Sequence, residues 1–201
     1  MLDGKVRELI DPALDRMGKV LAARGISANC VTGAGLAIGL AAALAIAFEA
    51  YLTGLVVLLI SRLADGLDGA VARHSQKTDL GGYLDIVSDF IFYGAIPLGF
   101  VFADPAANAV AGAVLIFSFY VNGSSFLAFA IMAEKQGLTT QTRGSKSLYF
   151  TTGLAEATET IAVFCAFCLF PTAFAPIATV FAAICFVTAG ARVLLAIRTF
   201  S

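Results

Sequence analysis

The sequence predicts an all-α integral membrane protein with six transmembrane helices, preceded by an amphipathic helix at the membrane interface. Of the 201 residues, 59% are hydrophobic and only 13% are charged. A soluble domain of this size carries about twice that charged fraction. The apolar residues also fall into six runs, each close to the ~20 residues that a spanning helix needs. Composition and run length therefore agree on one fold class.

The first 27 residues differ from the rest of the chain. They carry several acids and lack a continuous apolar run, which is unlike a secretory signal peptide. Within residues 5–24, apolar side chains recur at roughly helical spacing among charges, which is typical of a helix lying in the headgroup plane. A partly ordered cytoplasmic tail is the alternative. We expect residues 1–27 to form an interfacial segment and residues 28–201 to form one membrane domain.

Six apolar runs follow, separated by short links. They cover residues 28–49, 52–73, 80–102, 106–133, 147–170 and 174–198. Links around Glu49, at Asp104-Pro105 and from Pro171 to Pro176 should lie on one side of the membrane. Proline is well tolerated in the first turn of a helix, which suits Pro105. The links 74–79 and 134–146 and both termini should lie on the other side.

Basic residues are distributed on one side of this arrangement. The lysines and arginines of its links and termini are Lys5, Arg7, Arg16, Lys19, Arg24, Arg73, Lys77, Lys135, Arg143, Lys146 and Arg198. The opposite turns contain none. Positive residues favour the cytoplasmic side, so both termini are expected in the cytoplasm. The net charge is −1, so no basic surface for nucleic acid is expected.

Four aspartates interrupt the second and third runs. Asp65 and Asp68 precede Arg73 by eight and five residues, and Asp85 and Asp89 follow the start of the next run. At about 1.5 Å per residue, both pairs lie ~7–14 Å inside the cytoplasmic boundary. Spacings of three and four keep each pair on one helical face. Ionisable groups inside a membrane are costly and functional by default.

Four converging carboxylates indicate a site for divalent cations. Hard oxygen ligands favour Mg²⁺, Mn²⁺ or Ca²⁺ over softer metals. Two such ions a few ångströms apart can stabilise the attacking and leaving oxygens of a phosphoryl transfer. The small residues around the aspartates would let a ligand or another helix approach closely. They are Gly66, Gly69, Ala72, Gly81 and Gly82.

The spacing of these residues carries a family resemblance. The pattern runs Asp65-x-x-Asp68-Gly69-x-x-Ala72-Arg73, then a seven-residue spacer, then Gly81-x-x-x-Asp85-x-x-x-Asp89. It resembles the signature of the CDP-alcohol phosphatidyltransferases. The segment from Ser27 to Thr32 is similar to the Ser/Thr-Pro-Asn-x-x-Thr entry of many members. The spacer is one residue shorter than usual, and Ala28 stands where the family often has proline.

The resemblance implies an enzyme of phospholipid biosynthesis. It would transfer a phosphatidyl group from CDP-diacylglycerol to a small alcohol and release CMP, as a homodimer in a bacterial inner membrane. Asp65, Asp68, Asp85 and Asp89 would hold two Mg²⁺ or Mn²⁺ ions, and Asp89 would deprotonate the acceptor. The residues expected at the nucleotide and diphosphate are Asn29, Thr32, Gly69, Ala72, Arg73 and Gly81.

The acceptor side is less well defined by the sequence. Glu156 and Glu159 lie in the fifth run and could hydrogen-bond the acceptor or a neighbouring helix. Arg143 and Lys146 in the preceding link could bind an acceptor phosphate or be ordinary cytoplasmic charges. The acceptor itself is not predicted. Two other functions use intramembrane acids: a divalent-cation transporter and an aspartate-rich membrane prenyltransferase.

Overall fold

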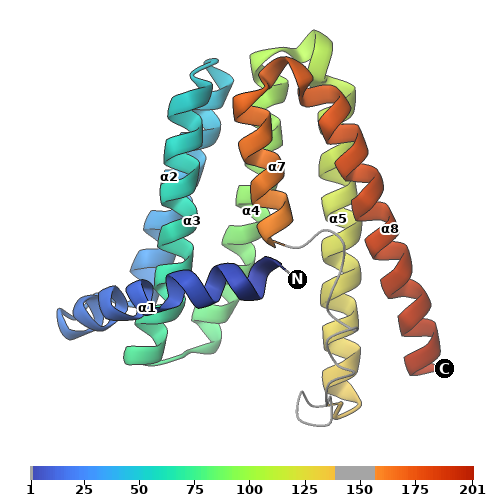
Figure 1. Cartoon of the computed structure of the whole chain (residues 1–201). Helices are drawn as coiled ribbons and strands as arrows, with labels where there is room; N and C mark the ends of the chain where they lie inside the picture. The colour runs from blue at the N-terminus through green and yellow to red at the C-terminus, as the bar shows by residue number, and fades with distance from the viewer. Residues whose placement is uncertain (1, 139–156) are drawn as a thin grey trace.

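Every regular element in the part of the chain that the structure describes, residues 2–138 and 157–201, is a helix. The structure is a computed structural model (Figure 1). In chain order the elements are α1 (Leu2–Ala23), α2 (Ala28–Ala47), α3 (Tyr51–His74), α4 (Asp79–Ala103), α5 (Pro105–Lys135), α7 (Ala157–Leu169), the 3₁₀ helix η3 (Pro171–Ala173) and α8 (Phe174–Phe200). The all-α class predicted from composition is confirmed.

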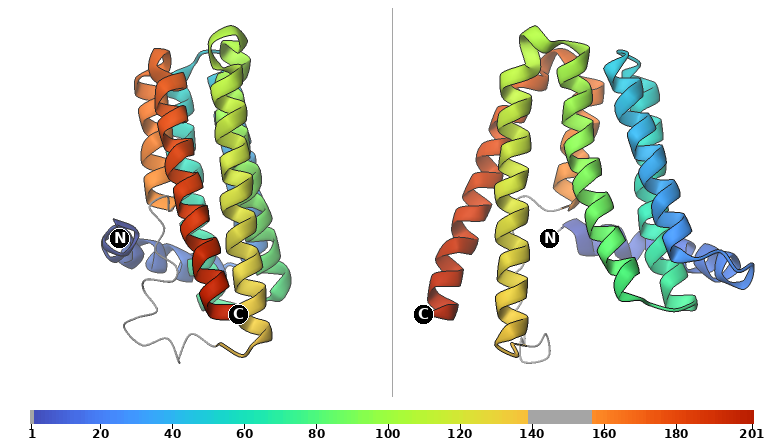
Figure 2. Two further views of the ribbon diagram at one scale, coloured as in Figure 1. Left: turned by 90° about the vertical axis from the view of Figure 1, so that its right-hand side faces the viewer. Right: turned by 180° about the vertical axis from the view of Figure 1, so that it is seen from behind.

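The long helices run alongside one another, and α1 crosses them (Figures 1 and 2). Helix α2 packs against both α3 and α4, while α5 packs mainly against α8. The links α2–α3, α4–α5 and α7–α8 lie at the upper end in Figure 1. The α3–α4 link, the end of α5 and the end of α8 lie at the lower end. This is the division of links that the sequence predicted for the two sides of a membrane.

Helix starts are fixed by side-chain caps at three of the predicted boundaries. Ser27 accepts a hydrogen bond from the Cys30 amide, and Thr78 accepts one from the Gly81 amide. Asp104 accepts one from the Ala107 amide, with Pro105 beginning α5. Such caps satisfy amides that the first helical turn leaves unpaired. The chain therefore enters α2, α4 and α5 where the sequence placed their starts.

Within residues 2–138 and 157–201, four helical segments are long and apolar enough to cross a membrane: α2, α4, α5 and η3 with α8. Helix α3 has 24 residues but carries the first aspartate pair and arginines within it. Helix α7 is described over 13 residues, and the first part of the expected run 147–170 lies outside the described residues. The protein is an all-α integral membrane protein, and six spans remain a prediction.

Aromatic rings form the core on the side of α4 that faces α7 and α8. Phe92, Phe100, Phe164, Phe167 and Phe174 are all fully buried. The Phe92 ring lies 6.0 Å from Phe164, and the Phe100 ring lies 4.9 Å from Phe174. These contacts fix the height of α7 relative to α4, which matters for the position of Glu159 below.

Helix α1 lies directly on α3. Leu14 is buried, and a β-carbon on Gly66 would come within 2.9 Å of its side chain. A β-carbon on Gly18 would lie 2.7 Å from Ala70, so α1 can approach α3 this closely only because residue 18 is glycine. Met17 and Val20 of the predicted apolar face remain exposed. Exposed apolar residues on a helix that crosses the bundle suit a membrane interface.

Candidate active site

Three of the four aspartates converge at one place. Asp65 and Asp68 come from α3 and Asp85 from α4, and one carboxylate oxygen from each lies within 4.8 Å of the others. Asp68 is buried, and its Oδ2 accepts a hydrogen bond of 2.6 Å from the Thr32 hydroxyl of α2. Three helices therefore build this group. Oxygen atoms so close together fit a divalent cation, which carboxylates bind readily.

The fourth aspartate, Asp89, is paired with an arginine side chain. Its Oδ1 accepts a hydrogen bond of 2.9 Å from Nη1 of Arg62, one α-helical turn before Asp65 on α3. The same nitrogen lies 3.4 Å from Oδ1 of Asp65. The Arg62 side chain is only 10% exposed. Arg62 was not among the site residues expected from the sequence, although its position three residues before Asp65 was a signal that it belongs to this site.

A second arginine–aspartate contact lies at the rim of the site. Nε of Arg73, near the end of α3, is 3.5 Å from Oδ1 of Asp15 on α1. Nε2 of His74 is 3.0 Å from the same oxygen. The interfacial helix thus reaches the arginine that was expected to contact the nucleotide. Asp15 was not among the predicted site residues, because nothing in the sequence shows how α1 lies relative to α3.

The remaining residues expected at the nucleotide surround the same end of the helices. The start of α2 faces the start of α4, since a β-carbon on Gly81 would lie 3.1 Å from Oδ1 of Asn29. Gly69 has open space where its β-carbon would be, and Ala72 is partly exposed one turn later. A ligand could therefore approach the α3 backbone at Gly69. Their contact with a nucleotide remains a prediction.

Only one of the four candidate acceptor residues falls in the described part of the chain. Arg143, Lys146 and Glu156 lie outside it. Glu159 is partly buried, and its Oε2 is buried without a hydrogen-bond partner among the described residues. On α7, Glu159 precedes Phe164 by five residues, ~7.5 Å along the helix axis. On α4, Asp89 precedes Phe92 by three residues, ~4.5 Å along the axis. Because the rings of Phe92 and Phe164 are in contact, Glu159 lies close to the level of Asp89.

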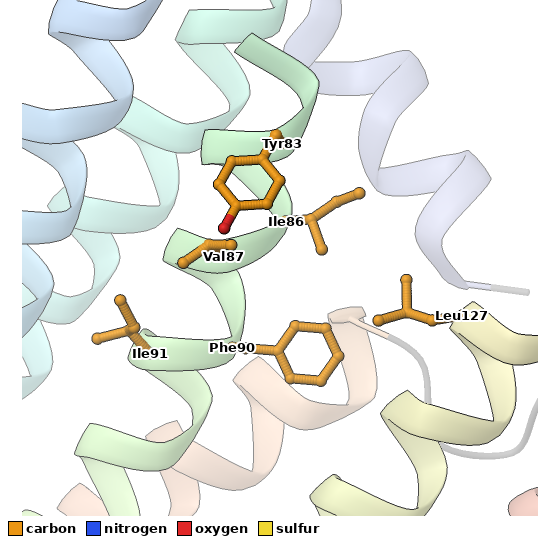
Figure 3. Close-up of a pocket in the computed structure, with 6 residues that line it drawn as sticks. All are labelled: Tyr83, Ile86, Val87, Phe90, Ile91 and Leu127. Atoms are coloured by element: carbon orange, nitrogen blue, oxygen red, sulfur yellow. The ribbon is translucent and has the colours of Figure 1, made fainter. Parts of the chain in front are cut away.

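An apolar groove runs beside this site between α4 and α5 (Figure 3). Its volume is about 530 Å³, and it is lined by Tyr83, Ile86, Val87, Phe90, Ile91 and Leu127. Leu127 faces the α4 side chains from α5. The lining offers almost no polar surface, so the groove suits hydrocarbon rather than a charged reactant.

The fold and the site define a membrane protein whose converging carboxylates suit a divalent cation and a phosphorylated ligand. The model of the CDP-alcohol phosphatidyltransferase family matches residues 25–194, which include all four aspartates. The chain belongs to this family and is an enzyme of its kind. The transporter and prenyltransferase alternatives are thereby set aside.

Relatives of known sequence agree with this assignment. The inner membrane protein YnjF of Escherichia coli (strain K12) is 47% identical over 193 residues, covering 96% of this chain and 94% of that protein. An archaetidylinositol phosphate synthase of Pyrococcus horikoshii is 31% identical over 60% of this chain and 64% of its own length.

Solved structures show the same fold. The phosphatidylinositol phosphate synthase PgsA1 of Mycobacterium tuberculosis with CDP-DAG bound matches with a TM-score of 0.71 and 22% identity, over 90% of this chain and 91% of that one. Its complex with manganese and citrate matches with a TM-score of 0.72 and 22% identity, over 90% and 87% of the two chains.

Proposed function

We propose that this protein transfers the phosphatidyl group of CDP-diacylglycerol to the hydroxyl of a small alcohol and releases CMP. A new bond forms between the acceptor oxygen and the phosphorus that carries the diacylglycerol, and the bond from that phosphorus to CMP breaks. The observation that carries the proposal is the convergence of Asp65, Asp68 and Asp85 within the family match. A solved structure of the same fold has CDP-DAG bound.

Each group of residues has a distinct part in this reaction. Asp65, Asp68 and Asp85 would hold Mg²⁺ or Mn²⁺, with two ions as the full complement. A divalent cation supplies charge neutralisation for the diphosphate and the departing CMP. Asp89 accepts the acceptor proton, a task that needs a carboxylate within hydrogen-bond reach of the hydroxyl. Thr32 holds Asp68 in place through its 2.6 Å hydrogen bond.

The nucleotide would enter at the ends of α2, α3 and α4. Gly69 leaves the α3 backbone open to it, Ala72 is partly exposed one turn later, and Gly81 lets the start of α4 lie close to Asn29. Arg73 would pair with a phosphate oxygen, and Asn29 would hydrogen-bond close by. The apolar groove between α4 and α5 suits an acyl chain, because its lining is hydrocarbon (Figure 3).

The acceptor would approach from the side of α7. Glu159 presents a buried carboxylate oxygen with no partner among the described residues, at the level of Asp89. We propose that it hydrogen-bonds the acceptor, with Glu156, Arg143 and Lys146 as further candidates. Two relatives are named archaetidylinositol phosphate synthases, so inositol phosphate belongs in any panel of acceptors.

The setting of the enzyme is part of the same proposal. A relative named as an inner membrane protein covers 96% of this chain, which supports the bacterial inner membrane. The one-sided basic residues support termini and active site in the cytoplasm. We propose residues 1–27 as the interfacial segment, residues 28–201 as a six-span domain, and a homodimer as the assembled form.

One assay tests the activity. Purified protein in detergent or nanodiscs is given CDP-diacylglycerol and Mg²⁺ or Mn²⁺, with inositol phosphate, glycerol phosphate, serine or choline as acceptor. CMP release that requires both the cation and one acceptor supports the proposal and identifies the acceptor. Failure to release CMP with every acceptor and either cation contradicts it.

The acceptor assignment has its own test. Glu159→Gln should raise the acceptor KM about tenfold or more, since a hydrogen bond to a charged group is worth ~1.5–3 kcal/mol. The KM for CDP-diacylglycerol should not change. Wild-type kinetics combined with a lower melting temperature would show instead that Glu159 has a structural role.

A further inference from the structure

Arg62 connects two of the four aspartates through a single nitrogen. Its Nη1 is 2.9 Å from Oδ1 of Asp89 on α4 and 3.4 Å from Oδ1 of Asp65 on α3. Asp65 also belongs to the group of three carboxylates that faces one cation-sized space. The guanidinium therefore lies at the border between those three carboxylates and Asp89.

Packing holds this guanidinium in one place. Its central carbon lies 3.6 Å from the centre of the Phe92 ring, and its Nη2 donates to the Ser61 hydroxyl at 3.3 Å. That hydroxyl donates in turn to the Gly35 carbonyl of α2 at 2.8 Å. Phe92 and Ser61 are both fully buried. Arginine stacked on a ring and paired with carboxylates has little freedom to move away.

The glycines of α2 make this packing possible. A β-carbon on Gly39 would lie 2.7 Å from the Phe92 ring and 2.9 Å from the Ser61 hydroxyl, closer than side chains tolerate. Three helices thus converge on Arg62. A buried arginine in a membrane helix is costly and functional by default.

We propose that Arg62 is a positioning residue for the transfer reaction. It fixes Asp89 for the acceptor hydroxyl and limits how tightly the aspartates bind divalent cations. A fixed positive charge beside Asp65 opposes any cation placed between the same carboxylates. Asp89, held by its Oδ1, keeps its other oxygen for the acceptor proton. This inference rests on the proposed function for its kinetic part but not for its cation-binding part.

The proposal predicts changes of opposite sign in one variant. Arg62→Met keeps an unbranched, flexible stem similar to that of arginine and removes the charged guanidinium. We expect Mn²⁺ to bind roughly tenfold more tightly, because a nearby cation no longer repels it. We expect kcat for CMP release to fall at least about tenfold with the KM for CDP-diacylglycerol unchanged, because Asp89 is no longer oriented. A purely structural role would lower both activity and Mn²⁺ affinity.

Mn²⁺ binding is measured without substrate, by the electron paramagnetic resonance signal of free Mn²⁺ during titration. Arg192→Met is the matched control for this measurement. Arg192 lies within α8 and contacts Asn122 and Ser125 rather than an aspartate, so its loss should leave Mn²⁺ affinity unchanged. Asp89→Asn should weaken Mn²⁺ binding more in the Arg62→Met background than in the wild type, since only there is Asp89 released from the guanidinium.

The outcomes separate this proposal from the proposed function. If the wild type releases no CMP, the proposed function fails while the Mn²⁺ titrations still test Arg62. Unchanged or weaker Mn²⁺ binding in Arg62→Met overturns the positioning role, as does an unchanged kcat. Should Arg62→Met fail to fold, Arg62→Lys serves in its place. Lysine keeps the positive charge but lacks the planar guanidinium. We therefore expect kcat to fall while Mn²⁺ affinity stays at the wild-type value. A lysine variant with normal kcat refutes the proposal.

Discussion

Two arginine–aspartate contacts in this molecule use the same chemistry in different surroundings. Arg62 and Asp89 join α3 to α4 inside the helix bundle, at 2.9 Å and with side chains 10% and 34% exposed. Arg73 and Asp15 join α3 to α1 at the rim, at 3.5 Å and with side chains 45% and 47% exposed. Exposed ion pairs contribute little to stability, whereas removing one partner of a buried ion pair is strongly destabilising. Burial should therefore decide which contact the enzyme depends on.

The largest effect is expected from Asp85, which belongs to the group of three converging carboxylates and is not hydrogen-bonded to Arg62. Asp85→Asn should reduce CMP release at least about a hundredfold, because the cation loses a charged ligand. The melting temperature should be kept or raised, since one of several neighbouring like charges is removed. Both quantities come from purified protein in detergent. A variant that loses stability in proportion to activity would show that the converging carboxylates serve mainly to join the helices.

The packing around the buried contact can be disturbed without touching a charge. Gly39→Ala places a methyl group against Phe92 and Ser61 and should lower the free energy of unfolding by ~1–3 kcal/mol. Gly33→Ala on the same helix is the control, because a β-carbon there meets nothing within 4 Å. It should be neutral or slightly stabilising. Equal melting temperatures for the two variants would contradict the close approach at Gly39.

Thr32 tests whether a neutral partner of the buried Asp68 matters as well. Thr32→Val removes the hydroxyl that donates to Asp68 at 2.6 Å and keeps the shape of the side chain. The loss of such a bond to a charged group costs ~1.5–3 kcal/mol. We expect this to appear as an activity about tenfold lower at limiting Mn²⁺, with partial recovery at high Mn²⁺. The activity of Thr32→Ser should stay close to that of the wild type, because serine keeps the hydroxyl. If Thr32→Ser loses as much activity as Thr32→Val, the hydrogen bond is not the cause.

The smallest effect is expected at the rim. Asp15→Asn should change CMP release by no more than about twofold at low salt, and this difference should vanish at high salt, because exposed charges are screened. A tenfold loss of CMP release in Asp15→Asn would show that the enzyme depends on the exposed contact as well, and that α1 is part of the catalytic machinery.

The rim contact also has a predictable pH dependence. The hydrogen bond to His74 is the main cause that lowers the pKa of Asp15 below its ordinary value of 3.8. A lowered pKa means that the contact favours the folded protein above that value and is lost as the pH falls through the folded pKa. As the pH falls below 3.8, the melting temperature difference between wild type and Asp15→Asn should therefore shrink.

The all-α class and the convergence of Asp65, Asp68 and Asp85 were predictable from the sequence, because both depend on local spacing. Residues three and four apart share a helical face, so Asp65 with Asp68 and Asp85 with Asp89 could be placed from the sequence alone. The starts of α2, α4 and α5 were also predicted, because Ser27, Thr78 and Asp104 cap them locally.

Contacts between helices distant in sequence were not predictable in the same way. The roles of Arg62 and Asp15 depend on how α4 and α1 are rotated against α3, and that rotation depends on close approaches at Gly39 and Gly18. A glycine in an apolar run is compatible with many arrangements, so its neighbour cannot be identified from one sequence. The expected run 147–170 is only partly described, which leaves Arg143, Lys146 and Glu156 as predictions.

Gly39 also bears on how such enzymes can be recombined. It allows α2 to approach the Phe92 ring of α4 and the Ser61 hydroxyl of α3 at once. An α2 taken from another enzyme would bring its own pattern of small and large residues to this junction. Chimeras that exchange α2, α3 and α4 together should therefore fold more often than chimeras that exchange one of them. The α4–α5 turn at Asp104 is the natural place to join two parents.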